Sequence, residues 1–158
     1  MLKGREIRGL PVFAGMKKEE VGRVQDLLIN DKSGEVEGLV ITGQGIWQKT
    51  YSVKMAHIKI LSKKGVFVPN KSHVKRLAKD SITLHQKDWV GSKLLSKKGE
   101  DKGTVSDVLI KNGIVAGLEI SAGLVGDLHQ RRDFIPWQNV SQQGHNFVES
   151  TFEDGQMS

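Results

Sequence analysis

The sequence is short of several residue types that define common protein classes. Its 158 residues include no cysteine, only three prolines, and 6% aromatic side chains. Without cysteine, neither a disulfide framework nor a thiolate zinc site can form. No apolar run approaches the ~20 residues of a membrane-spanning helix, and the N-terminus lacks the charged-then-apolar pattern of a secretion signal. These absences predict a cytoplasmic protein without membrane insertion.

Motifs for catalysis, metal binding and cofactor binding are also missing. No two of the five histidines stand three or four residues apart, and no carboxylate cluster accompanies them at ligand spacing. Gly43-Gln44-Gly45 is not followed by the Lys-Ser/Thr of a phosphate loop, and no Gly-x-Ser-x-Gly elbow occurs. We therefore expect a protein that is not an enzyme, with no catalytic residues, no metal and no cofactor.

What the sequence does contain is an internal repeat. The segment 22–29 (GRVQDLLI) recurs 81 positions later as 103–110 (GTVSDVLI), with the same Gly, Val, Asp, Leu and Ile. Upstream, 7–12 aligns with 89–94 at an offset of 82, and the later segment 53–58 aligns with 135–140 at that same offset. A repeat of this length predicts two copies of one small domain.

The repeat also predicts the domain boundaries. We expect the first domain over 1–68, a linker over 69–85, the second domain over 86–152 and a flexible tail over 153–158. Within the linker, Ser72 is placed to cap a short helix.

Each copy has the local pattern of short strands. Runs rich in branched apolar residues, first over 24–29, 36–42, 57–61 and 66–68, alternate with Gly, Asn, Asp and Lys. This spacing is typical of antiparallel sandwiches and barrels. Asn112-Gly113 predicts a two-residue hairpin turn, because both central positions of a type I′ turn need positive φ. The expected fold class is all-β: two small antiparallel β-barrels in tandem, joined by a linker with a short helix.

The repeated pattern resembles the PRC-barrel, a small β-barrel found in the photosynthetic reaction centre H subunit and in the ribosome maturation factor RimM. The resemblance rests on Gly-x-Val-x-Asp-x-Leu-Ile at 22–29 and Gly-Leu-Val-Ile at 38–41, with both segments recurring in the second copy. It implies a bacterial tandem PRC-barrel protein, a binding or adaptor module that supplies no catalytic residues. The H subunit's membrane helix and the RimM N-terminal domain have no counterpart in the sequence, so neither of those roles is implied.

Four polar or small residues occupy equivalent repeat positions: Gly22, Asp26, Gly103 and Asp107. One interpretation is a pair of acids that bind a cation or a basic partner. We favour a structural interpretation, in which each Asp accepts backbone N–H bonds near a turn and each Gly allows a bulge or an unusual backbone angle. Duplication in both copies favours structure, because fold constraints are duplicated more often than catalysis.

The copies differ in the loop 43–50, which carries Ile46-Trp47 where the second copy has Leu124-Val125. Large aromatic side chains are enriched at the centres of protein interfaces. We therefore expect Ile46, Trp47, Leu124 and Val125 to bind a partner. Folding of Trp47 back onto the barrel end is the alternative.

The leading functional hypothesis is a non-enzymatic adaptor or scaffold that binds a protein partner or self-associates. The net charge of +6 is uneven, with +5 in 1–68, +3 in 69–85 and −2 in 86–158. The alternative is therefore a nucleic-acid- or ribosome-associated protein that uses the basic first half and the linker. A ligand inside either barrel is disfavoured, because so narrow a barrel is filled by its own side chains.

Overall fold

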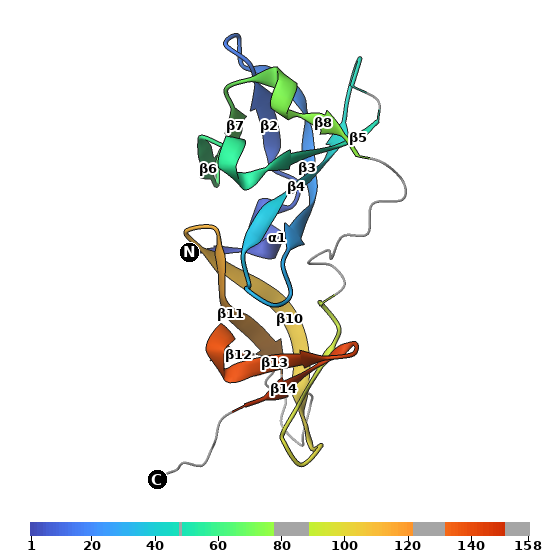
Figure 1. Cartoon of the computed structure of the whole chain (residues 1–158), viewed down its shortest axis with the longest axis vertical. Helices are drawn as coiled ribbons and strands as arrows, with labels where there is room; N and C mark the ends of the chain where they lie inside the picture. Colours follow the sequence, from blue (N-terminus) through green and yellow to red (C-terminus); the bar gives the residue numbers. More distant parts are fainter. Residues whose placement is uncertain (48, 78–88, 122–131, 151–158) are drawn as a thin grey trace.

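The computed structural model describes residues 1–47, 49–77, 89–121 and 132–150, and it shows two β-rich units stacked along the long axis of the molecule (Figure 1). The upper unit, barrel 1, is a seven-stranded sheet in the order β6-β7-β2-β3-β4-β5-β8. Its strands are β2 (Pro11–Ala14), β3 (Glu19–Ile29), β4 (Val36–Gly43), β5 (Thr50–Lys54), β6 (Ile60–Ser62), β7 (Gly65–Val68) and β8 (Lys75–Arg76).

The lower unit, barrel 2, has the strand order β13-β14-β9-β10-β11-β12, which matches the order of barrel 1 from β6 to β5. Its strands are β9 (Lys93–Leu95), β10 (Asp101–Lys111), β11 (Ile114–Ser121), β12 (Arg132–Pro136), β13 (Val140–Gln143) and β14 (Asn146–Glu149). The all-β tandem fold is thus confirmed. Each sheet also holds one parallel pair, β2 with β7 and β9 with β14, so neither sheet is purely antiparallel.

Most of the expected strands are present. The hairpin predicted at Asn112-Gly113 follows from the local chemistry of its turn. Asn112 and Gly113 have φ of 53° and 75°, and Lys111 pairs with Ile114, as the predicted hairpin requires. The expected strand over 57–61 is shorter, because a 3-10 turn, η1 (Met55–His57), occupies its beginning and β6 starts only at Ile60.

The expected linker helix is a single 3-10 turn, η2 (Lys71–His73). Its cap is Asn70 rather than Ser72, since the Asn70 side chain accepts a hydrogen bond from the Ser72 N–H at 2.9 Å. The chain then enters β8, where Arg76 pairs with Tyr51 of β5. Part of the segment 69–85 is therefore built into the sheet of barrel 1.

The N-terminal end of the chain crosses from barrel 1 to barrel 2. β1 (Leu2–Lys3) pairs with β10, with Leu2 opposite Ile110 and Lys3 opposite Leu109. The short helix α1 (Gly4–Ile7) follows and contacts both β3 and β10, and its Ile7 is fully buried. In the described ranges this four-residue helix is the longest α-helix. No helix in those ranges is long and apolar enough to cross a membrane.

The two units meet at the turns of their longest hairpins. The Val36 N–H donates to the Gly113 carbonyl at 2.9 Å, and the Val115 N–H donates to the Gly34 carbonyl at 2.7 Å. Gly34 and Gly113 occupy equivalent places in the two copies. Buried side chains from both units form one continuous cluster, so the barrels share a core.

Candidate functional site

The outer end of barrel 1 exposes two large apolar side chains. Met16, in the β2–β3 turn, is 96% exposed, and Ile46, in the β4–β5 loop, is 87% exposed. Hydrogen bonds join the loop to the start of β3: the Gln44 N–H donates to the Val21 carbonyl, and the Gln44 side chain donates to Glu20. Both turns therefore lie at one end of the molecule, which we call the apolar tip and define by Met16 and Ile46.

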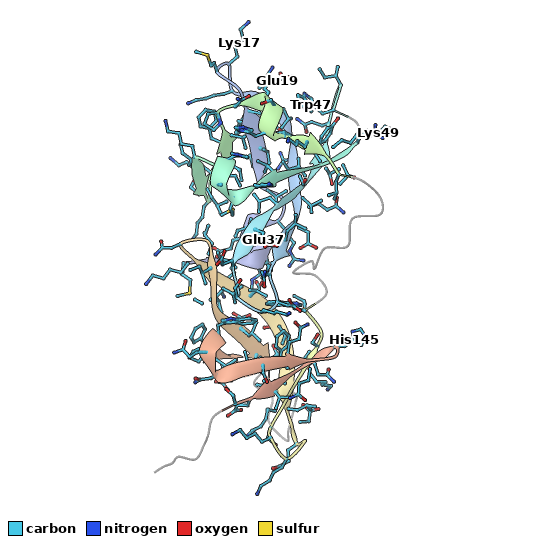
Figure 2. All side chains as sticks on the ribbon, viewed as in Figure 1. Lys17, Glu19, Glu37, Trp47, Lys49 and His145 are labelled. Atoms are coloured by element: carbon cyan, nitrogen blue, oxygen red, sulfur yellow. The ribbon has the colours of Figure 1, made fainter. Side chains whose placement is uncertain are left out.

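Trp47 is folded back beside the apolar tip. Its Nε1 donates to Glu19 Oε2 at 3.2 Å, and its ring packs edge-on against Tyr51 with centroids 5.3 Å apart. Figure 2 shows Trp47 beside Glu19 at this end. Hydrogen bonds from Lys71 and Trp47 lower the pKa of the Glu19 carboxyl, in spite of its partial burial. Of the two interpretations of Trp47, the structure therefore has the folded-back one, and Ile46 is the side chain that projects.

Lysines surround the apolar tip. Lys17 and Lys49 are exposed there and make no ion pair with any described residue, whereas Lys71 is paired with Glu19 (Figure 2). Lys18 lies over the ring of Phe67, 5.3 Å from its centroid. The tip thus combines two apolar side chains with unpaired positive charge.

The other two predicted partner residues, Leu124 and Val125, lie outside the described residues. The strands that lead to the two loops can be placed. β4 and β11 both begin at the meeting point of the barrels and run away from it, so Gly43 and Ser121 reach opposite ends of the molecule (Figure 1). The structure does not bring the starts of these two loops together.

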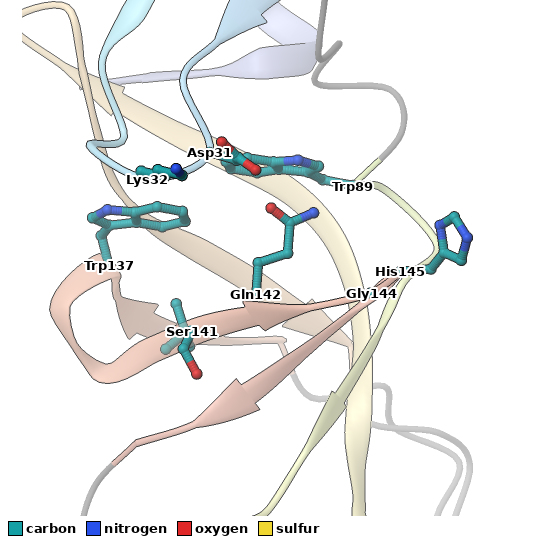
Figure 3. Close-up of a pocket in the computed structure, with 9 residues that line it drawn as sticks. Asp31, Lys32, Trp89, Trp137, Ser141, Gln142, Gly144 and His145 are labelled. Atoms are coloured by element: carbon teal, nitrogen blue, oxygen red, sulfur yellow. The ribbon is translucent and has the colours of Figure 1, made fainter.

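A pocket lined by described residues lies where the barrels meet. This junction pocket has a volume of about 760 Å³ and takes Asp31 and Lys32 from the β3–β4 turn of barrel 1. Barrel 2 supplies the rest: Trp89, Trp137, Val140, Ser141, Gln142, Gly144 and His145. The Trp89 and Trp137 rings are nearly parallel, with 6° between their planes and 5.3 Å between their centroids. In Figure 3 the two barrel 1 side chains lie over the indoles.

Two buried polar atoms of the junction pocket lack hydrogen-bond partners among the described residues. Trp89 is 1% exposed, yet its Nε1 donates to no acceptor, and the buried Oε1 of Gln142 accepts from no donor. Figure 3 shows the Gln142 amide extending from β13 toward Trp89. An unpaired buried donor or acceptor costs about 1–3 kcal/mol, so such atoms are rare in folded proteins.

Asp26 and Asp107 are fully buried at equivalent bulges of β3 and β10. Each accepts a hydrogen bond at 2.8 Å from the N–H of the next residue, Leu27 or Val108. Asp107 also meets Arg5 from the N-terminal segment, with Nε 3.5 Å from Oδ2. In this arrangement Asp107 ties the start of the chain to barrel 2.

Glu119 completes this charged group beside β1. Lys3 Nζ lies 3.0 Å from Glu119 Oε2, and Arg5 Nη1 lies 3.4 Å from Oε1. Burial alone would raise the pKa of Glu119. Hydrogen bonds from Lys3 and Ser106, together with the charge of Arg5, outweigh burial and hold that pKa below its usual range.

The two repeat glycines, Gly22 and Gly103, are required for different structural reasons. Gly103 has φ of 132° at an irregularity between β9 and β10, which fits the expected unusual backbone angle. Gly22 has no positive φ. It is required by space, because a Cβ there would lie 2.2 Å from the Thr42 carbonyl oxygen.

Sequence reasoning missed a stacked histidine pair. His57 of η1 and His73 of η2 lie face to face, with ring centroids 3.6 Å apart and 13° between the planes. Burial lowers the pKa of His57, and the charges of His73, Lys54 and Lys75 lower it further. Spacing along the chain could not reveal this pair, because the two turns meet only in the fold. Within the described ranges, no group of three or more His, Asp or Glu side chains is placed to hold a metal ion.

Comparison with known proteins gives a family and distant structural similarities. A sequence search among curated proteins finds no match. The structure is similar to that of a putative 16S ribosomal RNA processing protein, RimM, from Pseudomonas aeruginosa, with 10% identity, a TM-score of 0.33, and coverage of 83% of this chain and 98% of that one. So distant a similarity carries no function across. The PRC-barrel domain model matches residues 1–86 and again 82–155. The chain therefore belongs to the PRC-barrel family and holds two copies of the domain in tandem.

Proposed function

We propose that this protein is a non-enzymatic adaptor that binds a protein partner through the apolar tip of barrel 1. The observation that carries the proposal is the exposure of Met16 and Ile46 on neighbouring turns at one end of the molecule. Apolar side chains buried at the centre of an interface supply much of its binding energy. Trp47 and its bond to Glu19 anchor the loop, so Ile46 is held in place before a partner arrives.

The charges around the tip indicate the chemistry of the partner. Lys17 and Lys49 are exposed and form no ion pair with a described side chain. A partner surface with an apolar centre and an acidic rim would match this arrangement, and the lysines would speed its association at low salt. A second copy of this chain is a weaker fit, because its corresponding end carries the same positive charge.

The proposal can be tested with a photo-crosslinking amino acid in the full-length chain. We expect benzoylphenylalanine at position 46 to give a defined protein adduct in cells, and Met16→Glu to abolish that adduct by placing a charge in the apolar contact. The same crosslinker at Phe134, which is half exposed on barrel 2, is the matched control. No adduct at position 46 beyond that seen at position 134 would contradict the proposal.

Nucleic-acid binding is the second candidate function, and the exposed basic side chains of one edge of barrel 1 support it. Lys75 and Arg76 are exposed on β8, the outermost strand of the sheet, and Lys71 precedes them in η2. If this edge contacts phosphates, replacing Lys75 and Arg76 with Gln should reduce the salt dependence of log K by about 1.8, at roughly 0.9 per contact with duplex DNA. Lys97→Gln with Lys98→Gln, on a barrel 2 turn, is the control. Absence of any complex at low salt would dismiss this candidate.

A further inference from the structure

We propose that the junction pocket binds the peptide group of an extended polypeptide segment, which lies along the outer edge of β13. The inference does not depend on the apolar tip, because the pocket lies where the barrels meet and shares no residue with the tip. It rests on the unpaired polar atoms of the pocket, on the free edge of β13 and on a difference between the two copies.

The unpaired atoms fix the chemistry of the ligand. Trp89 Nε1 offers a donor and Gln142 Oε1 offers an acceptor, and neither has a partner among the described residues. A peptide group carries a carbonyl acceptor and an N–H donor on adjacent atoms. Its carbonyl would accept from Trp89 and its N–H would donate to Gln142, so one ligand group would remove both unsatisfied positions.

The edge of β13 indicates that the peptide group belongs to an extended chain. β13 is the last strand in the order of its sheet, with β14 on one side and no described strand on the other. An extended segment can pair with such an edge through main-chain hydrogen bonds, while adjacent pockets receive its side chains. Val140, Ser141 and Gln142 of β13 all line the pocket, so the pocket lies along this strand.

The first copy lacks the groups that would make this site. At the repeat offset of 82, the positions of Trp89, Trp137 and Gln142 hold Ile7, Met55 and Ile60. None of these three side chains can donate a hydrogen bond, and the only acceptor among them is the weak one of the Met55 sulfur. Among the described residues the peptide site is therefore assigned to the face where barrel 2, unlike barrel 1, has polar and aromatic side chains.

The rim and size of the pocket suit a peptide. The volume of about 760 Å³ falls within the roughly 300–1,000 Å³ typical of ligand pockets. Asp31 and Lys32 bring one charge of each sign from barrel 1, which favours a polar ligand without strong net charge. Because these two residues come from the other barrel, the pocket is complete only while the barrels are docked.

The indole N–H signals of the full-length protein provide a direct test by NMR. The chain has three tryptophans, and Trp47 serves as an internal control because its N–H is already bonded to Glu19. On titration with N-methylacetamide, the smallest trans peptide group, we expect the Trp89 indole proton to shift downfield in a saturable way while that of Trp47 stays in place. Acetate, which lacks the N–H donor, should bind at least tenfold more weakly. Saturable binding of acetate alone, or no shift of the Trp89 signal, would overturn the proposal.

Variants of β13 test the assigned contacts. Gln142→Ala should weaken N-methylacetamide binding about tenfold, the equivalent of about 1.4 kcal/mol for one lost hydrogen bond. Gln142→Glu keeps an acceptor oxygen and should retain most of the binding, whereas exposed Gln143→Ala should change nothing. Equal binding by all three variants would contradict the role of Gln142.

A longer probe tests the contribution of the strand edge. N-acetyl-tetraalanine amide, which adds further main-chain groups, should bind at least tenfold more tightly than N-methylacetamide if it pairs with β13. Equal affinities of the two probes would refute the placement along β13.

Discussion

At the scale of single residues, Asp107 carries a charge in the interior of the protein. It has no exposed surface, and its partners include the Val108 N–H and Arg5. Asp107→Ala removes the acceptor and leaves a buried N–H unpaired. We expect a loss of about 2–4 kcal/mol in the free energy of unfolding, measured by urea denaturation.

Exposed Asp133 on β12 provides the control for this substitution. Asp133→Ala should change the free energy of unfolding by less than about 0.5 kcal/mol. A loss for Asp107→Ala no greater than that control would show that the buried carboxylate contributes nothing to stability.

Substitutions at Gly22 and Gly99 distinguish two reasons why a glycine stabilises the fold: lack of space for a Cβ and a positive φ. A Cβ on Gly22 would collide with the Thr42 carbonyl, whereas Gly99, with φ of 89°, has open space around it. Gly22→Ala should therefore lower the free energy of unfolding by about 2–3 kcal/mol, and Gly99→Ala by about 1 kcal/mol. Thermal unfolding of the two variants compares them directly, and a reversed order would contradict the close approach of β3 and β4.

At the scale of elements, the stacked histidines join η1 to η2. The pKa of His57 is lowered by burial and by His73, Lys54 and Lys75, so the folded chain binds this proton less readily than the unfolded chain. The contribution to stability is therefore fully present above the unfolded pKa of 6.5 and is lost as pH falls below it. We expect the urea midpoint to decrease between about pH 7.5 and 5.5.

Replacing one ring isolates this effect. His57→Phe keeps an aromatic ring against His73 but removes the titrating group, so the decrease over this pH range should become smaller. His145→Phe, at an exposed position in barrel 2, is the matched control and should leave the decrease unchanged. An unaltered pH dependence in His57→Phe would exclude the histidine pair as its source.

Elements also differ in how far the sequence could predict them. The Asn112-Gly113 turn and its flanking strands were predictable because positive φ and branched apolar runs are local properties. The pairing of Leu2 and Lys3 with β10 was not, since a two-residue strand has no periodicity and its partner lies far along the chain.

The same distinction applies to the candidate sites. Ile46 could be selected because an apolar residue in a Gly-rich loop stands out in the sequence. The junction pocket could not, because Lys32, Trp89 and Gln142 come from distant segments that meet only when the barrels dock. Whether a polar atom of the pocket is left unpaired depends on how the side chains pack, which the sequence alone does not show.

At the scale of the whole molecule, the crossing of the N-terminal segment predicts that the barrels unfold together. β1 and Arg5 contact barrel 2, while the residues that follow α1 form barrel 1. Deletion of residues 1–5 should therefore destabilise barrel 2, although the deleted residues precede barrel 1. We expect this loss to exceed that of any single ion pair, because a strand and its charged contacts are removed together.

The tryptophans report on the two barrels separately. Trp47 belongs to barrel 1, and Trp89 and Trp137 belong to barrel 2. In the intact protein their indole NMR signals should disappear at one urea concentration, as expected for a single cooperative unit. Two well-separated transitions in the intact protein would show that the shared core does not couple the barrels.

The paired hydrogen bonds between the hairpin turns have a consequence for the internal symmetry of the molecule. Val36 binds Gly113, and Val115, the counterpart of Val36, binds Gly34, the counterpart of Gly113. Contacts exchanged reciprocally in this way are those that two-fold symmetry generates between identical subunits. The tandem chain thus has, within one polypeptide, the contact pattern of a two-fold homodimer. Fusion makes the pairing independent of protein concentration, and it leaves each half free to diverge.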